Sequence, residues 1–384
     1  MHRKSIYGLL LAVAVLIVIG CVMLFSTSAF VNEKGKSPEY FIKHQSTWLA
    51  IGIFLCAVVA KTDYLHWRRV AWPLYGVAAV LLVLCFVPHI GMKLNGAHRW
   101  LNLGFASFQP SELAKLAVVT LIARWFTQKE CEPTQFVKGF LVPLCIAGGL
   151  MALIVFEVDM GSTALIGAAA IGVMFIAGTR VSYIAPIFIG SLVLMIYIAH
   201  QMPERMHRIL AFQNLEEFKA GAGLQQYQGL IAFGSGGVNG LGLGMGRQKM
   251  AYLPYAHTDF IFPMVGEELG LRFTLLVVFC FLVIVICGAI ISMRARDRFG
   301  MLLGFGVVLL ISLQAVVNIG VTTALLPNKG MPLPFISYGG SNLVFCLVCV
   351  GILINIYRRG LTEKEVNRGS AKLEVKTRRR FVRI

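Results

Sequence analysis

Long apolar stretches separated by short polar connections dominate this chain. A helix needs about 20 mostly apolar residues to cross a bilayer. Ten stretches approach that length, at about residues 6–26, 45–61, 70–89, 112–127, 136–156, 162–179, 182–200, 268–293, 300–326 and 341–357. The pattern predicts an all-α fold, a polytopic membrane helical bundle of about ten transmembrane helices. A large extracytoplasmic loop, about 201–267, is expected between spans 7 and 8.

The composition supports a bilayer as the solvent. Of the 384 residues, 57% are hydrophobic and 14% charged, whereas soluble domains carry about 25% charged residues. The first apolar stretch is too long for the core of a signal peptide and is expected to stay as a span. Eight of the nine cysteines lie in apolar runs, and their spacing matches neither a zinc nor a haem site.

Basic residues near span ends set the orientation of a membrane protein. If Arg3 and Lys4 are cytoplasmic, every connection on that side carries Lys or Arg, and an even span count makes both termini cytoplasmic. The prediction is a membrane domain at 1–357 and a basic cytoplasmic tail at 358–384, where ten basic residues face three acidic ones. The net charge of +17 is therefore placed where it can interact with anionic lipid headgroups. This distribution excludes nucleic acid as a partner.

Unusual polar residues gather in four groups, all on the predicted outer side. These candidate site residues are Arg99, Glu112 and Lys115; Glu157 and Asp159; His257, Thr258, Asp259 and Glu267; and Lys329 and Ser337. Because the four groups are scattered in sequence but share one side of the membrane, they predict one site that opens outward. Ionisable residues at membrane depth are a functional hypothesis by default.

Individual residues in these groups allow more than one interpretation. Ser111 is expected as the N-cap of its helix, and Glu112 and Lys115, three residues apart, share a face and can form either a structural or a functional ion pair. Asp259 precedes an apolar run, so partial desolvation can raise its pKa towards that of a base. The glycine-rich segment 234–246 is either a flexible or tightly turning connection or a backbone-amide cradle for a phosphate.

Several short motifs together resemble one family. They are Arg-Trp at 99–100, Gln-Pro-Ser-Glu-Leu-Ala-Lys at 109–115, Glu-x-Asp-x-Gly at 157–161, Ala-His-Thr-Asp-Phe-Ile-Phe at 256–262, Gly-Glu-Glu at 266–268 and Pro-Phe-Ile-Ser-Tyr-Gly-Gly-Ser at 334–341. In this order they resemble the SEDS family (shape, elongation, division and sporulation), of the FtsW/RodA/SpoVE type, and most of all its cell-division FtsW branch. Val158 departs from the pattern, since proline is usual there.

The resemblance implies a peptidoglycan glycosyltransferase that polymerises lipid II, an undecaprenyl-pyrophosphoryl disaccharide-pentapeptide, into glycan strands at the outer face of the bacterial cytoplasmic membrane. It implies Asp259 as the catalytic base and the other candidate residues as substrate-binding. The pyrophosphate leaving group needs cations. Candidates are Arg99, Lys115, Arg247, Lys249, Lys329 and a divalent ion, Mg or Mn, whose ligands the sequence does not assign.

The resemblance also implies partners and leaves rival functions open. A class B penicillin-binding protein transpeptidase and other divisome proteins are the expected partners, at the division septum. The rivals are a lipid II flippase or transporter that makes no bond, a scaffold for a division complex, and an elongation-type, RodA-like polymerase. Formation of glycan strands from lipid II separates a polymerase from a flippase.

Overall fold

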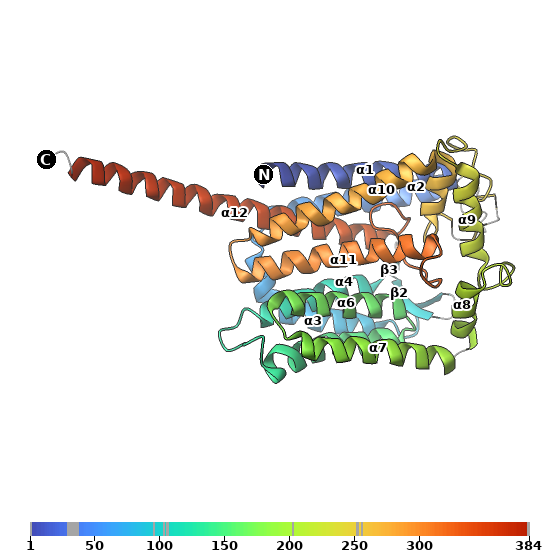
Figure 1. The fold of residues 1–384 in the computed structure, drawn as a ribbon, viewed down its shortest axis with the longest axis horizontal. Helices are drawn as coiled ribbons and strands as arrows, with labels where there is room; N and C mark the ends of the chain where they lie inside the picture. The colour runs from blue at the N-terminus through green and yellow to red at the C-terminus, as the bar shows by residue number, and fades with distance from the viewer. Residues whose placement is uncertain are drawn as a thin grey trace.

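Helices that run side by side form the body of the protein in this computed structural model (Figure 1). The structure describes residues 2–28, 38–94, 97–102, 104, 107–201, 203–250, 253–254 and 256–381. The helices are α1 (His2–Ser28), α2 (Pro38–Lys61), α3 (Leu65–Leu84), α4 (Pro110–Trp125), the π-helix η1 (Val137–Leu141), α5 (Val142–Phe156), α6 (Met160–Ala177), α7 (Val181–Gln201), α8 (Pro203–Gln213), α9 (Leu224–Gly236), α10 (Ile261–Met293), α11 (Arg298–Thr322) and α12 (Gly340–Phe381). The expected helical membrane bundle is confirmed. Part of the expected outer segment 27–44 lies outside the described residues.

Each of the ten expected spans corresponds to a helix. Within the described residues, eight helices are long and apolar enough to cross a bilayer. The other two are α4 and α7. Helix α4 has only 16 residues, but nearly all of them are buried, since it packs against α3, α5, α6 and α11. A helix surrounded by protein in this way does not need an apolar surface for lipid, which explains how it carries charged residues.

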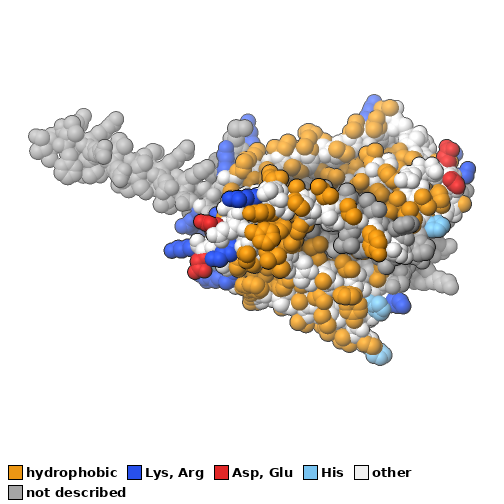
Figure 2. Space-filling view, turned by 60° about the horizontal axis from the view of Figure 1, so that its bottom comes forward, with side chains coloured by type: hydrophobic (Ala, Val, Ile, Leu, Met, Phe, Trp, Pro, Cys, Tyr) orange, Lys and Arg blue, Asp and Glu red, His pale blue; other side chains and the backbone are white. Residues whose placement is uncertain are grey.

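The two ends of the bundle differ in structure and charge. The N-terminus of α1 and the projecting part of α12 lie at one end, whereas α8 and α9 lie at the other (Figure 1). Hydrophobic side chains cover most of the face between the two ends in Figure 2, and many Lys and Arg side chains gather where α12 projects. This distribution is the one expected for a bundle whose middle faces hydrocarbon.

A small sheet follows α3, in the connection between the spans expected at 70–89 and 112–127. Strand β1 (Gly91–Leu94) pairs antiparallel with β2 (Ala97–Asn102), which pairs antiparallel with β3 (Ser107–Phe108). The chain enters the sheet at Gly91, where a Cβ atom would lie 1.9 Å from the Cys85 carbonyl oxygen. Strand β2 carries Arg99 and so fixes one of the candidate site residues on regular structure.

The long segment expected outside, 201–267, is more ordered than the sequence predicted. It contains α8 and α9, and α10 starts at Ile261, seven residues before the expected start of the span at 268. The helix is interrupted at Gly270, whose φ of 81° favours glycine. The early start is possible because Glu267, which the expected span left out, and Glu268 both find partners inside the protein.

Helix α11 brings polar groups to the site from the centre of the bundle. It packs against α4, α6 and α10. The contact with α4 is close, since a Cβ atom at Gly306 would lie 2.2 Å from Val119 Cγ1. Two polar residues on α11, Gln314 and Asn318, are four positions apart and thus on one face. Both are buried and both reach the loop that follows α11.

Candidate active site

Asp259 lies in the turn directly before α10, held between two other parts of the chain. Asn318 Nδ2 donates hydrogen bonds to the carbonyl oxygens of Asp259 (2.8 Å) and Met331 (2.6 Å). One side chain of α11 therefore ties the segment before α10 to the loop 327–339. Asn318 is not among the predicted site residues, although a polar residue inside an apolar span is a usable signal.

The segment 257–259 is also bound directly to the loop 327–339. Ser337 Oγ donates to the Thr258 carbonyl oxygen (2.6 Å) and accepts from the Leu333 amide (2.7 Å), and the Tyr338 amide donates to the His257 carbonyl oxygen (3.0 Å). The His257 ring packs on Tyr338. These contacts give Ser337 and His257 a role in positioning the backbone beside Asp259, while their predicted contact with substrate stays a prediction.

The Asp259 carboxylate faces the backbone at Gly330. A Cβ atom at Gly330 would lie 2.6 Å from Asp259 Oδ2, so glycine is what allows this approach. Burial raises the pKa of the Asp259 carboxyl to about 6, with the positive charge of Arg99 opposing the rise and the negative charge of Asp159 adding to it. At neutral pH such a group is mostly ionised, and it is a stronger base than an ordinary aspartate.

Asp159 lies near this carboxylate and caps α6. Its Oδ1 accepts from the Ser162 amide (3.2 Å), and its Oδ2 accepts from Ser162 Oγ (2.8 Å) and from Gln109 Nε2 (3.4 Å). A Cβ atom at Gly161 would lie 2.9 Å from Lys329 Cε, so the Lys329 side chain crosses the first turn of α6. The structure therefore brings Asp159, Asp259 and Lys329 together from three separate sequence groups.

Arg99 joins the same cluster from strand β2. Its Nη2 donates to the Val158 carbonyl oxygen (2.6 Å), and its buried Nε has no hydrogen-bond partner among the described residues. Val158 has a φ of 63°, which is costly for a β-branched residue and which the ring of proline does not allow. The departure from the family's usual proline at this position thus accompanies a turn that proline could not form.

Glu157, two residues from Asp159, has a different environment. It is 1% exposed, and the Cys85 thiol lies close to its carboxyl group. Burial raises the pKa of Glu157 to about 8, the Cys85 thiol and Arg99 opposing the rise and Asp159 adding to it. Glu157 is therefore mostly protonated at pH 7, while Asp259 is mostly ionised, and the two carboxyl groups cannot play the same part.

Glu112 and Lys115 form the buried ion pair that their spacing predicted. Lys115 Nζ lies 2.7 Å from Glu112 Oε2 and 3.0 Å from Gln314 Oε1. Gln314 Nε2 donates to the Pro332 carbonyl oxygen (2.9 Å), which connects the pair to the loop 327–339. Ser111 is not the N-cap as predicted: Gln109 holds that position because Pro110, with no amide hydrogen to lose, starts α4.

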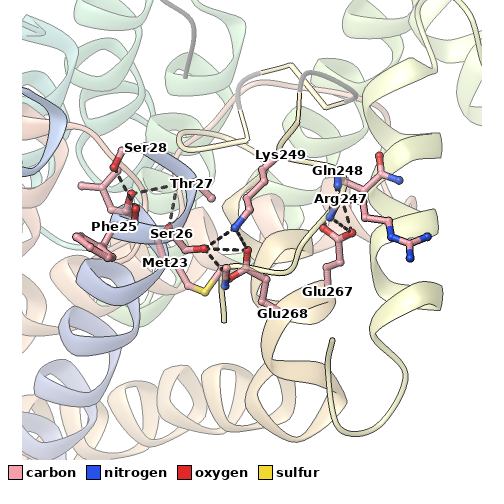
Figure 3. Close-up of polar contacts among 12 residues, drawn as sticks. Met23, Phe25, Ser26, Thr27, Ser28, Arg247, Gln248, Lys249, Glu267 and Glu268 are labelled. Atoms are coloured by element: carbon pink, nitrogen blue, oxygen red, sulfur yellow. Dashed lines mark hydrogen bonds and ion pairs between the residues drawn. The ribbon is translucent and has the colours of Figure 1, made fainter. Parts of the chain in front are cut away.

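Glu267 and Glu268 belong to a separate network, drawn in Figure 3. Glu267 Oε1 accepts from the backbone amides of Arg247 (2.7 Å) and Gln248 (3.2 Å). Glu268 Oε2 accepts from the Gly244 amide (3.0 Å), and Glu268 Oε1 lies 2.6 Å from Lys249 Nζ. The glycine-rich segment does form an amide cradle, but in this structure the chain's own carboxylates occupy it.

This network removes two residues from the Asp259 cluster. Lys249 was a candidate cation for pyrophosphate, but it is 5% exposed and also donates to Ser26 Oγ at the end of α1 (2.7 Å). The structure corrects that prediction, because a buried and paired ammonium group is not available to a ligand. Glu267 is 1% exposed, and its predicted contact with substrate has no support in this geometry.

Comparison with known proteins places the chain in a family. The family model described as "Cell cycle protein" (FTSW_RODA_SPOVE) matches residues 7–360. A probable peptidoglycan glycosyltransferase FtsW from Geobacter metallireducens is 40% identical over 359 residues, which cover 93% of this chain and 96% of that protein. Stage V sporulation protein E of Bacillus subtilis is 36% identical over 361 residues, covering 93% and 98%.

Two solved structures share the fold. The rod shape determining protein RodA of Thermus thermophilus is 25% identical with a TM-score of 0.68, and the match covers 92% of this chain and 96% of that one. A chain from a peptidoglycan synthase complex that coordinates polymerization and crosslinking is 23% identical with a TM-score of 0.76, covering 92% and 98%. Both likenesses extend over nearly the whole bundle.

Proposed function

This chain belongs to the FtsW, RodA and SpoVE family of cell cycle proteins, and on that premise we propose that it is a peptidoglycan glycosyltransferase that polymerises lipid II. The observation that carries the proposal is the Asp259 carboxylate, which is partly buried, feels the positive charge of Arg99, and faces Gly330, the residue after Lys329. A base next to cations suits a reaction that removes a proton from one sugar and releases an anion from another.

Asp259 acts as the general base in this proposal. It accepts the proton of the 4-hydroxyl of the acceptor N-acetylglucosamine, and the oxygen attacks the anomeric carbon of the donor N-acetylmuramic acid. The bond from that carbon to the pyrophosphate oxygen breaks, and undecaprenyl pyrophosphate leaves with the bonding electrons. A single displacement turns an α-linked donor into a β-linked product.

Two cations of the cluster, Arg99 and Lys329, would stabilise the departing pyrophosphate. The unpartnered Nε of Arg99 can donate to a phosphate oxygen. The Lys329 side chain crosses the first turn of α6, where Gly161 leaves room for it because it has no side chain. A divalent ion, Mg or Mn, would be a further candidate for this role, and within the described residues no group of three or more His, Cys, Asp or Glu side chains is arranged to hold it.

Polymerisation of labelled lipid II by the purified protein is the decisive test. Wild-type protein should form glycan strands, and Asp259→Asn should form almost none while remaining folded and inserted. Glu217→Gln is the matched control, because it also removes one carboxylate but an exposed one, in the segment 201–267. Movement of lipid II between leaflets without strand formation by the wild type would instead support a flippase.

The proposal also covers where in the cell the enzyme acts and which protein it binds. The similarity to FtsW proteins favours a role in division, at the septum, over elongation. The similarity to a chain of a peptidoglycan synthase complex supports a transpeptidase of the class B penicillin-binding type as the partner. Co-purification of such a transpeptidase with both wild type and Asp259→Asn would separate partner binding from catalysis.

The orientation of the bundle is part of the proposal. Both termini are assigned to the cytoplasm and the segment 201–258 to the outside, since Lys and Arg gather at the end from which α12 projects (Figure 2). A cysteine in place of Lys219 should react with an impermeant maleimide in sealed cells, and one in place of Lys372 should not. Labelling of the Lys372 position from outside would reverse the assignment.

A further inference from the structure

A hollow of about 370 Å³ lies at the end of the bundle away from Asp259. It forms where the start of α3, the connection after α4 and the connection between α10 and α11 meet. The side chains of Phe126 and Phe299 are buried behind its wall. The 33-residue helix α10 separates it from Asp259, so it is not part of the active site.

Three basic side chains line this hollow: Arg68, Lys129 and Arg298. All three are exposed, so their charges are accessible from solvent. Arg298 Nη2 donates to the Ala177 carbonyl oxygen (2.8 Å), which fixes its guanidinium group while leaving other N–H donors available. Three cations from separate parts of the chain thus converge on one concave surface.

The acidic residue among the lining residues, Asp297, offsets only one of these three charges. Its Oδ1 accepts hydrogen bonds from Tyr64 O–H (2.9 Å) and from the Gly300 amide (2.8 Å), because Asp297 caps α11. The positive field also reaches Cys131 in the wall. Burial raises the pKa of the Cys131 thiol, and Arg298 opposes that rise. The hollow therefore keeps an excess of positive charge.

The neighbouring side chains place the hollow at the height of lipid headgroups. Trp72 lies four residues after Arg68, on the same face of α3, and is 48% exposed. Tryptophan is enriched where membrane meets water. Phe136 and Val137, at the start of η1, are also exposed. An anion that reaches this pocket can therefore remain attached to acyl chains in the adjoining bilayer.

We propose that this pocket, defined by Arg68, Lys129 and Arg298, binds the phosphate group of an anionic phospholipid in the leaflet at that end of the bundle. Guanidinium groups hold phosphate oxygens through paired N–H donors, and ammonium groups act on them as point charges. The site is independent of glycosyl transfer and would exist whatever reaction occurs at Asp259.

The test measures lipid retained by the full-length protein. Wild type is reconstituted in phosphatidylcholine vesicles with and without phosphatidylglycerol, exchanged into detergent, and analysed by native mass spectrometry. One phosphatidylglycerol per chain should remain on wild type. Each cation near a membrane surface contributes about fivefold in affinity. Replacing Arg68, Lys129 and Arg298 by Gln should thus weaken retention by about a hundredfold.

Controls separate the pocket from general surface charge. A triple variant at Lys61, Arg69 and Arg294 removes three exposed cations that do not line the pocket, and it should retain the lipid. The double variant of Arg68 and Lys129 leaves the Arg298 contact with Ala177 intact, so its expected loss of about 25-fold cannot be attributed to unfolding. Equal lipid loss in both triple variants would overturn the proposal. If inorganic phosphate at an equal concentration displaced the lipid, the pocket would be a site for free phosphate and the proposal of a phospholipid ligand would be wrong.

Discussion

Gly330 lies so close to Asp259 that a Cβ atom added to it would stand 2.6 Å from the carboxylate oxygen Oδ2. The position of the proposed base is therefore controlled by the absence of a side chain on the neighbouring loop. Gly330 sets the position of Asp259 without a hydrogen bond to its carboxylate. The methyl group of an alanine at position 330 is enough to test this effect.

Gly330→Ala is expected to lower the rate of lipid II polymerisation by about a hundredfold, because a displacement of about 1 Å at a reacting group can have that effect. The midpoint of thermal unfolding should change little. Gly339→Ala is the control in the same loop, since the nearest atom to its Cβ would be 3.9 Å away. Equal rates for the two variants would show that the approach of Gly330 to Asp259 does not matter for catalysis.

Asp259→Asn is expected to lower activity by about 10²–10⁴-fold, as removal of a general base does. With a pKa of about 6, the wild-type rate should rise with pH up to about 6 and then level off. Because the folded pKa lies above the ordinary 3.8, ionised Asp259 destabilises the folded state, and stability falls as pH rises from about 4 to 6. At pH 7 the inactive Asn variant should therefore melt at the same or a higher temperature than wild type.

Glu157→Gln should retain activity at pH 7, since glutamine resembles the protonated acid that burial favours. The folded pKa is raised from 4.5 to about 8, so wild type loses stability across this range relative to the Gln variant. The difference in melting temperature should widen with pH up to about 8 and stay constant above it. A difference that does not vary with pH would show that Glu157 is already ionised in the folded protein.

The Glu112–Lys115 pair should show strong coupling in a double-mutant cycle. Removing one partner of a buried pair costs about 3–5 kcal/mol, because the other charge stays buried without compensation. Glu112→Gln and Lys115→Met should each destabilise the protein more than the double variant does. The ion pair of Asp63 with Arg359 serves as the comparison, because the Arg359 side chain is 43% exposed. The coupling energy of this pair should be less than about 1 kcal/mol. Additive effects at Glu112 and Lys115 would argue against the pair.

Gly246→Ala is expected to loosen the glycine-rich segment from α10. A Cβ atom at Gly246 would lie 2.8 Å from Glu268 Oε1 and 2.9 Å from Glu267 Oε2, within the network of Figure 3. Limited proteolysis between residues 237 and 250 should become faster, whereas Gly234→Ala, with open space at its Cβ, should behave as wild type. Unchanged proteolysis would mean that the carboxylates can move aside without loss of the cradle.

The sequence allowed the helices and the ion pair of Glu112 with Lys115 to be predicted, because each depends on local pattern and spacing. It did not allow Asn318 or Gln314 to be placed in the site, since both act across long sequence separations on backbone carbonyl groups. Lys249 was misassigned for a related reason. A lysine in a polar loop looks exposed, and only the fold shows that Glu268 and Ser26 enclose it.

The burial of the two ion pairs has a consequence for how the enzyme should respond to ionic strength. Dissolved ions screen exposed charges over about 8 Å at physiological concentration but hardly affect pairs such as Glu112–Lys115 and Lys249–Glu268, which water does not reach. Arg99 and Lys329, by contrast, are only partly buried. A change in turnover on adding salt would therefore report mainly on how these two cations meet the pyrophosphate, with the scaffold around them unaltered.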